Sequence, residues 1–230
     1  MRKRASDPAS AKNGGVVDRL STTYGHLWGK KPQAVAKPRA LTSEVRDLFA
    51  ADAVRAEMIA TAAHAAQLGL VAGQLSEASL RLGGDKFLVT AASSWLYQLH
   101  DDDLLLASDT PEKGFAEEAL PTYWPLHLAG YRQTPQAGAA LLGHPAAALA
   151  LMAAGKLPAP GLLAGAEALG NFVMCAAEAE QVSQALGPAR VIFVKGVGVL
   201  VFAETLQQAV IDLQLVNRLS EISWYQTRGM

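Results

Sequence analysis

The side chains that could bind a metal ion or transfer a proton are widely spaced in this sequence. Beyond residue 40 the histidines are His64, His100, His127 and His144. No two of them have the short spacing that lets histidines on one element share a metal ion. A metal site would therefore have to be assembled from distant segments. Packing is the simpler interpretation for His127, and a hydrogen bond to neighbouring backbone is the simpler one for His144.

Three further patterns have the residue types of a functional site but lack its spacing. The run Asp101–Asp103 offers carboxylates, but it lacks the spaced ligands and the glycine of a calcium-binding loop. The glycine-rich run at 195–198 lacks the spacing of a phosphate-binding loop, and no Lys-Ser or Lys-Thr pair follows it. Cys175 lies among Ala and Met in a predicted helix without a basic residue nearby, so we expect it to be buried rather than reactive.

The composition of the 230 residues predicts a soluble, globular protein. Half of them are hydrophobic and 18% are charged, which is enough apolar material to form a core. A single cysteine rules out an intramolecular disulfide framework and any cysteine-rich zinc module. No apolar run reaches the roughly 18–20 residues that a membrane span requires, so we predict no membrane span.

Basic and acidic residues are distributed unevenly around a formal net charge of −1. Residues 1–40 hold nine Lys or Arg and two acids, whereas residues 41–230 hold eleven Lys or Arg and nineteen acids. We therefore predict a basic, extended arm over residues 1–40 and a single domain over residues 41–230. The residues through which this arm would dock are Arg2, Lys3, Arg4, Lys30, Lys31, Lys37 and Arg39.

The role of the arm stays open at this point. Its Arg- and Ser-rich, acid-poor composition is similar to that of an organellar, mitochondrial-type transit peptide, although its Pro and Gly weaken the helix that such a peptide needs. A solvated tail and a docking element are the alternatives, and contacts to nucleic-acid phosphates are a further one. We expect an intracellular protein, either cytoplasmic or organellar.

The pattern of the body predicts short strands flanked by helices. A helix begins at Thr42-Ser43 and continues as an Ala-rich run from Asp52 to Leu68. A β-hairpin follows, with strands over 75–82 and 86–90. Further strands are predicted over 101–108, 138–142, 189–194 and 198–202, and further helices over 125–132, 145–154, 164–186 and 205–225. This order of elements predicts a three-layer α/β domain.

Three blocks of sequence, in this order, resemble one known family. They begin as LGLVAGQLSEASLRLGGDKFLVTAAS at residue 68, LPTYWPLHLAGYRQTPQAGAALLGHP at residue 120 and VIFVKGVGVLVFAETLQQAVIDLQLV at residue 191. Together they are similar to the class II aldolase/adducin family, of the fuculose-phosphate aldolase type, over residues 50–225. The resemblance implies a three-layer α/β/α domain with a central, mainly antiparallel sheet.

The resemblance also implies a metal site, which this sequence keeps only in part. In the family, three histidines hold a zinc ion that stabilises an enediolate, and a glutamate beside it serves as acid and base. The first and third histidine positions fall on Leu142 and Val197, and only the second is kept, as His144. The glutamate position falls on Tyr123. Because one imidazole does not hold zinc, we expect no metal cofactor and no catalytic residue here.

The phosphate-binding positions of the family are changed as well. Its Gly-Asn pair falls on Ser76 and Glu77, which places an acidic side chain where the resemblance implies a phosphate. The next Thr/Ser-Gly pair falls on Ala92 and Ser93. The degenerate site positions are thus Glu77, Ala92, Ser93, Tyr123, Leu142 and Val197.

The resulting hypothesis is a pseudoenzyme, a non-catalytic structural or interaction module with the class II aldolase/adducin fold. The resemblance implies a homo-oligomer. Alternatively, the chain is one subunit of a larger complex of protein subunits, and we expect the basic arm to be a docking or targeting element. Trp95, Trp224 and Tyr225 are candidate interface aromatics, although core packing would explain each equally well. The alternative is a metal-dependent aldehyde-lyase, similar to sugar-phosphate aldolases, with a rebuilt metal site.

Overall fold

The computed structural model describes residues 43–92, 94–109, 119–159, 161, 163, 166–186 and 189–227. The chain divides into two units, Met1–Arg46 and Asp47–Met230, and the second carries the sheet. The basic arm and its docking residues lie outside the described residues, so the arm, its boundary and its role stay predictions. Across the described part, no helix is both long enough and apolar enough to cross a membrane.

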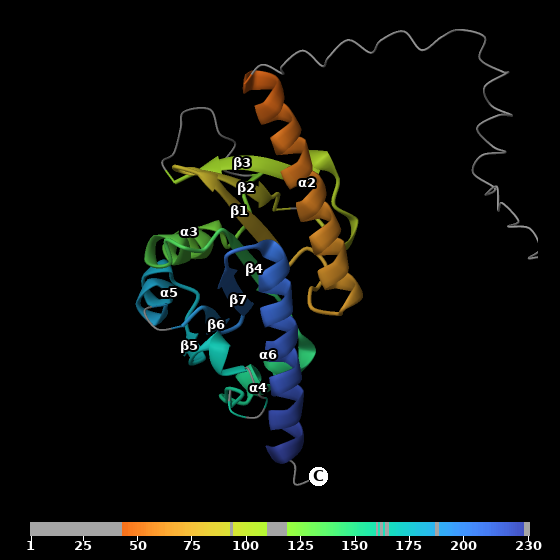
Figure 1. The fold of residues 1–230 in the computed structure, drawn as a ribbon. Coiled ribbons are helices and arrows are strands. Elements are labelled where there is room, and N and C mark those ends of the chain that lie inside the picture. Colours follow the sequence, from red (N-terminus) through yellow and green to blue (C-terminus); the bar gives the residue numbers. More distant parts are fainter. Residues whose placement is uncertain are drawn as a thin grey trace, which may run out of the picture. The chain divides into compact units, whose positions relative to one another are not determined.

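Seven strands in the described part of the chain form one sheet (Figure 1). In chain order they are β1 (Glu77–Gly83), β2 (Lys86–Thr90), β3 (Leu104–Ser108), β4 (Ala139–Gly143), β5 (Val173–Cys175), β6 (Val191–Val194) and β7 (Gly198–Ala203). Their order across the sheet is β3-β2-β1-β4-β7-β6-β5, and every neighbouring pair is antiparallel except β5 and β6. The predicted mainly antiparallel sheet is therefore confirmed.

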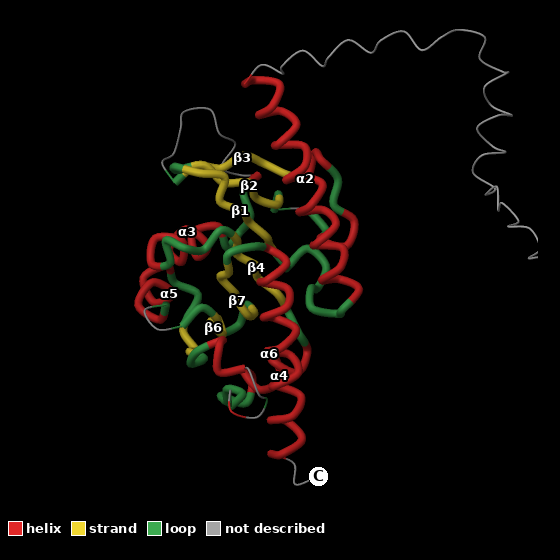
Figure 2. Tube along the Cα trace, viewed as in Figure 1, coloured by secondary structure: helices red, strands yellow, loops and turns green. Residues whose placement is uncertain are grey.

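Helices cover both faces of this sheet, as Figures 1 and 2 show. The described helices are α2 (Ser43–Gln67), α3 (Trp124–Gln133), α4 (Ala146–Ala153), α5 (Ala179–Ala185) and α6 (Leu206–Thr227). On one face α3 packs with α5, and on the other α4 packs against α6, beside α2. The predicted three-layer α/β architecture is confirmed.

Alternate side chains of the central strand β4 enter two separate cores. Ala139 and Leu141 pack with α2 and α6, whereas Ala140 and Leu142 pack with α3 and α5. Each of the four is at most 1% exposed. A strand that is buried on both faces needs apolar residues at every position, which is why this segment shows no alternating pattern. β4 is therefore the strand that both layers share.

The long helix predicted over residues 164–186 is wrong. This segment contains a 3-10 turn at Ala166–Leu169, then strand β5, and then the short helix α5. Gly170, with a φ of 73°, changes the chain direction in a conformation that glycine adopts readily. β5 then finds a parallel partner in β6, so tertiary pairing overrides the helix propensity of the many alanines. Cys175 consequently lies on a strand rather than in a helix, and it is buried as expected.

Gly130 allows α3 to lie close against β7. A Cβ at this position would lie 1.9 Å from the ring of Phe202, which is itself 1% exposed. We expect Gly130→Ala to lower the free energy of unfolding by about 1–3 kcal/mol, because the helix must move away from a packed ring. Urea denaturation measures this loss. Gly161→Ala is the matched control, since a Cβ there meets nothing within 4 Å, and equal losses in both variants would contradict the packing argument.

Candidate functional site

The three positions that the resemblance assigns to zinc ligands lie together. Leu142 is near the end of β4, His144 follows that strand, and Val197 precedes β7 in the turn from β6. A Cβ on Gly198 would lie 3.2 Å from Leu142 Cδ1 and 3.1 Å from His144 Nε2, so both side chains border this glycine. The same Cβ would lie 2.6 Å from a backbone carbonyl oxygen of β4, so only glycine fits at position 198.

Hydrogen bonds within the protein orient His144. Its Nδ1 lies 2.8 Å from the Oγ of Ser76, and its ring also has a backbone hydrogen bond with Val197. Its backbone N–H donates to the carbonyl oxygen of Leu70 at 2.8 Å. Burial lowers the pKa of the ring, which favours the neutral imidazole. His144, the one histidine at a position that the resemblance assigns to a zinc ligand, is therefore engaged by protein partners.

The residues at these positions do not fit a zinc ion. Leu142 is fully buried, and it and Val197 carry aliphatic side chains, which have no lone pair to donate. Only the imidazole of His144 remains, and a structural or catalytic zinc site takes three or four protein ligands. Among the described residues, no group of three or more His, Cys, Asp or Glu side chains is placed to hold a metal ion.

Glu77 projects from β1 toward the start of α3. Both of its carboxylate oxygens lie 3.0 Å from the backbone nitrogen of Tyr123, which donates the hydrogen bond. The resemblance assigns the family's glutamate to the position of Tyr123, so a carboxylate from another element reaches the position where an acid would be expected. Glu77 also lies opposite Leu142 in the β1–β4 pair. Because Glu77 is only 5% exposed, it is part of a buried site rather than a charge on an open phosphate loop.

The surroundings of Glu77 favour its protonated form. Burial raises its pKa to about 7, and hydrogen bonds from the backbone N–H groups of Tyr123 and Thr122 limit that rise. These donors stand at the start of α3, where the helix dipole stabilises negative charge. Desolvation is the larger effect, so this carboxyl group titrates close to neutral pH.

A series of buried polar groups continues from Glu77 beneath α3. The Nε2 of His127 lies 3.9 Å from the Oε2 of Glu77, and its Nδ1 lies 2.8 Å from the Oγ of Ser79. The hydroxyl of Tyr131 lies 3.0 Å from that Oγ and donates to the carbonyl oxygen of Ser79 at 3.0 Å. Burial lowers the pKa of His127 to about 3, so its ring is neutral. We call Glu77, His127, Ser79 and Tyr131 the buried polar chain.

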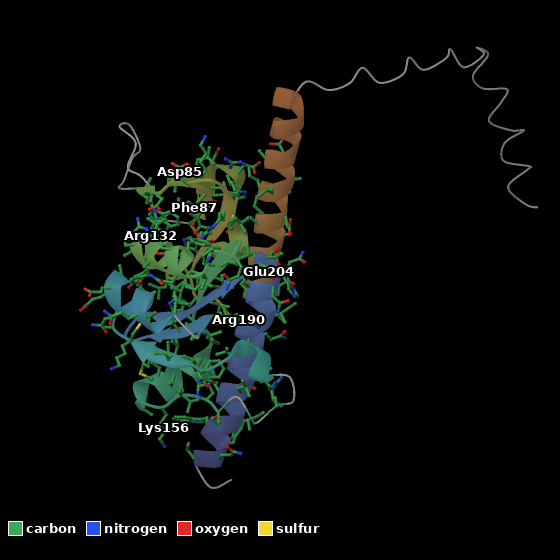
Figure 3. The ribbon with its side chains drawn as sticks, turned by 60° about the vertical axis from the view of Figure 1, so that its left-hand side comes forward. Asp85, Phe87, Arg132, Lys156, Arg190 and Glu204 are labelled. Atoms are coloured by element: carbon green, nitrogen blue, oxygen red, sulfur yellow. The ribbon has the colours of Figure 1, made fainter. Side chains whose placement is uncertain are left out.

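Arg81 and Phe87 hold the far end of the buried polar chain in place. The guanidinium of Arg81 lies 4.9 Å from the centroid of the Tyr131 ring, and its Nη2 donates to the carbonyl oxygen of Tyr131 at 2.7 Å. The ring of Phe87, labelled in Figure 3, lies 4.9 Å from the Tyr131 ring and 5.2 Å from Trp124. These contacts fix the Tyr131 hydroxyl against Ser79.

The sequence contains a signal for the buried polar chain that comparison with family motifs misses. Glu77 and Ser79 are two residues apart on a strand, so their side chains point to the same face. His127 and Tyr131 are four residues apart on a helix, and they also share a face. Polar residues at these two matched spacings, within apolar segments, indicate a strand and a helix that face each other.

The remaining positions that the resemblance assigns to phosphate binding are Ala92 and Ser93. Ala92 donates its backbone N–H to the carbonyl oxygen of Ala119 at 3.0 Å. Ser93 lies outside the described residues. Of the positions that the resemblance assigns to the active site, the structure thus brings together Glu77, Tyr123, Leu142, His144 and Val197.

The other residues that drew attention in the sequence lie elsewhere. Asp103 accepts a hydrogen bond from the backbone N–H of His100 at 2.8 Å, so the acidic run closes a 3-10 turn. Trp95 and Tyr225 are 43% and 57% exposed, whereas Trp224 is partly buried. The two exposed rings remain available as candidate interface aromatics.

Known families and structures match this chain over most of its length. The family described as Class II Aldolase and Adducin N-terminal domain matches residues 56–224. No curated protein sequence matches the chain significantly.

Three solved structures illustrate the shared fold. L-fuculose-1-phosphate aldolase from Thermus thermophilus has a TM-score of 0.65 at 22% identity, over 76% of this chain and 94% of that one. L-fuculose 1-phosphate aldolase from Glaciozyma antarctica has a TM-score of 0.67 at 17% identity, over 85% and 80%. Sugar-phosphate aldolase from Thermotoga maritima has a TM-score of 0.65 at 16% identity, over 76% and 94%. At these identities the likeness concerns the fold alone. With the match over residues 56–224, the chain belongs to the class II aldolase and adducin N-terminal domain family.

Proposed function

We propose that this chain is a non-catalytic member of its family, which uses the class II aldolase fold in a structural or binding role. The observation that carries the proposal is that Leu142 and Val197, at the positions that the resemblance assigns to zinc ligands, pack in the same apolar core with aliphatic side chains. Without those ligands, His144 has no partners with which to hold a Lewis-acidic ion.

Two further features support a role in binding. The acid/base position of the family carries Tyr123, whose backbone N–H is used to hold Glu77. Trp95 and Tyr225 expose aromatic rings of the type that is enriched at protein interfaces. As partners we propose further copies of this chain or other protein subunits, with the basic arm as a docking or targeting element.

The second candidate function is a metal-dependent aldehyde-lyase with a rebuilt metal site. It draws on the solved neighbours, which are sugar-phosphate aldolases by name. It also draws on Glu77, because a carboxyl group that titrates near neutral pH suits an acid or base. The two candidates differ in whether the purified chain retains a metal ion.

Metal analysis of the purified chain tests the proposal. We expect substoichiometric zinc after dialysis and no retro-aldol cleavage of L-fuculose 1-phosphate, because the remaining donors cannot hold the ion. Mass spectrometry with inductively coupled plasma measures the metal content. His144→Ala and the exposed His64→Ala form a matched pair of variants. Stoichiometric zinc that is lost in the first variant and kept in the second would contradict the proposal and favour the lyase.

A further inference from the structure

The buried polar chain contains a nitrogen without a hydrogen-bond partner. His127 is fully buried, and its Nε2 is unpaired. The Oε2 of Glu77 lies 3.9 Å away, just beyond hydrogen-bond distance. A buried nitrogen without a partner destabilises the folded state, so a small movement that closes this gap is favoured. The hydrogen bond that closes the gap can use a proton on Nε2 of His127 or a proton on the carboxyl group of Glu77.

When Glu77 is ionised, its carboxylate can only accept hydrogen bonds. The gap then closes if His127 carries its proton on Nε2 and donates it to the carboxylate. The bare Nδ1 accepts the hydroxyl proton of Ser79, which lies 2.8 Å away. The hydroxyl of Tyr131 keeps its hydrogen bond to the Ser79 carbonyl oxygen. Every member of the buried polar chain has a partner in this state.

When Glu77 is protonated, its hydroxyl group needs an acceptor, and a bare Nε2 provides one. The imidazole stays neutral because it is fully buried, so it must carry its proton on Nδ1. That N–H donates to the Oγ of Ser79, whose own proton turns to the oxygen of Tyr131, 3.0 Å away. In total one proton enters and none leaves. The imidazole changes tautomer, and the hydroxyl of Ser79 rotates.

We propose that the buried polar chain is a proton-linked switch, in which one proton taken up at Glu77 reverses the tautomer of His127 and loosens the start of α3. The connection to α3 is the backbone N–H of Tyr123, which donates to both oxygens of the carboxylate. A hydrogen bond to a neutral carboxyl group is weaker than one to an ionised carboxylate. Proton uptake therefore weakens the anchor of α3 at the position where the family has its acid.

Glu77 is the proton acceptor of the switch, because the groups that face it are apolar or stay neutral. From α3 it faces His127, and from β4 it faces the apolar Leu142. The preceding Ser76 is bonded to His144, whose lowered pKa keeps that ring neutral. Arg81 lies at the far end of β1, over the ring of Tyr131. Burial, which raises the pKa of Glu77 to about 7, places the transition in the physiological range.

Nitrogen-15 NMR of the full chain, labelled in its histidine rings, tests the switch. Protonated and bare ring nitrogens differ in chemical shift, so each tautomer is observed directly. As pH rises from about 5.5 to 8.5, we expect His127 to change from the Nδ1–H to the Nε2–H tautomer without becoming an imidazolium. The midpoint should lie near pH 7. Below the midpoint, the hydrogen-exchange protection factor of the Tyr123 amide should fall about fivefold.

Two variants separate a switch from a merely structural hydrogen bond. Glu77→Gln resembles the protonated state, because its amide N–H₂ donates to Nε2, and it should fix the Nδ1–H tautomer at every pH. Ser79→Ala removes the partner of Nδ1 in both states. A buried N–H donor without a partner is less well tolerated than a bare acceptor, so the variant should disfavour the Nδ1–H tautomer and move the midpoint to lower pH.

A single tautomer of His127 over the whole pH range in the unaltered chain would overturn the switch. An imidazolium at low pH would overturn it as well, because the ring would then be the proton acceptor. Both outcomes are read from the unaltered chain, so they do not depend on the folding of a variant. The switch also stands apart from the proposed function, since it requires neither metal binding nor its absence.

Discussion

Leu142→His combined with Val197→His is expected to create zinc binding in a chain that we expect to bind none. Both positions lie beside His144, and three histidines with one open position form the ligand set of many catalytic zinc sites. Removing even an outer partner of a zinc ligand weakens binding about 10–100-fold, so restoring two ligands should raise affinity by at least about 100-fold. Native mass spectrometry and thermal unfolding with added zinc measure the gain.

The matched control is the double variant Leu142→Gln and Val197→Gln. It places polar side chains at the same buried positions without imidazole nitrogens, so both doubles lose stability in the absence of metal. Only the histidine double should regain stability when zinc is added, because three converging histidines in the folded state bind zinc more tightly than the unfolded chain does. Equal behaviour of the two doubles would show that positions 142, 144 and 197 do not converge as described. The outcome therefore tests the geometry independently of any activity.

Glu77→Gln is expected to stabilise the fold at pH 8 and to lose this advantage as the pH falls. Folding raises the pKa of this carboxyl from 4.5 to about 7, mainly through burial. Between these values the folded chain holds a proton that the unfolded chain has released, so the unaltered chain loses stability as pH rises through this window. A tenfold difference in proton affinity corresponds to about 1.4 kcal/mol, which gives a loss of up to about 3 kcal/mol.

Glutamine does not ionise, so the variant keeps at pH 8 the stability that the unaltered chain has only near pH 4.5. Urea denaturation at several pH values measures the difference between the two proteins. Glu57→Gln is the control for the same change of residue type at an exposed position, because Glu57 is exposed on α2. A constant difference between the Glu77 variant and the unaltered chain from pH 4.5 to 8 would show that Glu77 is not a buried titrating group.

Short-range patterns predict most of the elements. The hairpin of β1 and β2, the apolar segment of β4 and the ends of α2 and α6 agree with the predicted ranges to within about two residues, a usual margin for element ends. The failure at residues 164–186 has a tertiary cause. Their alanines favour a helix locally, but β6 offers hydrogen bonds to Val173–Cys175, which becomes the edge strand of the sheet. Local sequence patterns do not indicate that a segment will pair with a strand that is distant along the chain.

The sequence by itself determines which atoms are present at the positions that the resemblance assigns to the active site. It has Leu142 and Val197 at two of these positions, and no folding can give an aliphatic side chain a lone pair. It also carries the motifs that mark the family, as the match over residues 56–224 confirms. The prediction that this chain lacks the family's zinc ligands therefore follows from residue identity alone.

Only the tertiary structure determines the burial of Glu77 and therefore its pKa. From the sequence, Glu77 is an acidic residue at a position that the resemblance assigns to phosphate binding, and an exposed charge there would repel phosphate. In the fold it meets the backbone of Tyr123, 46 residues away, and lies 3.9 Å from a buried imidazole. The cost of removing a carboxylate from water depends on every group packed around it, and those groups come from separate elements. Residue identity is local, whereas the pKa of a buried group belongs to the assembled fold.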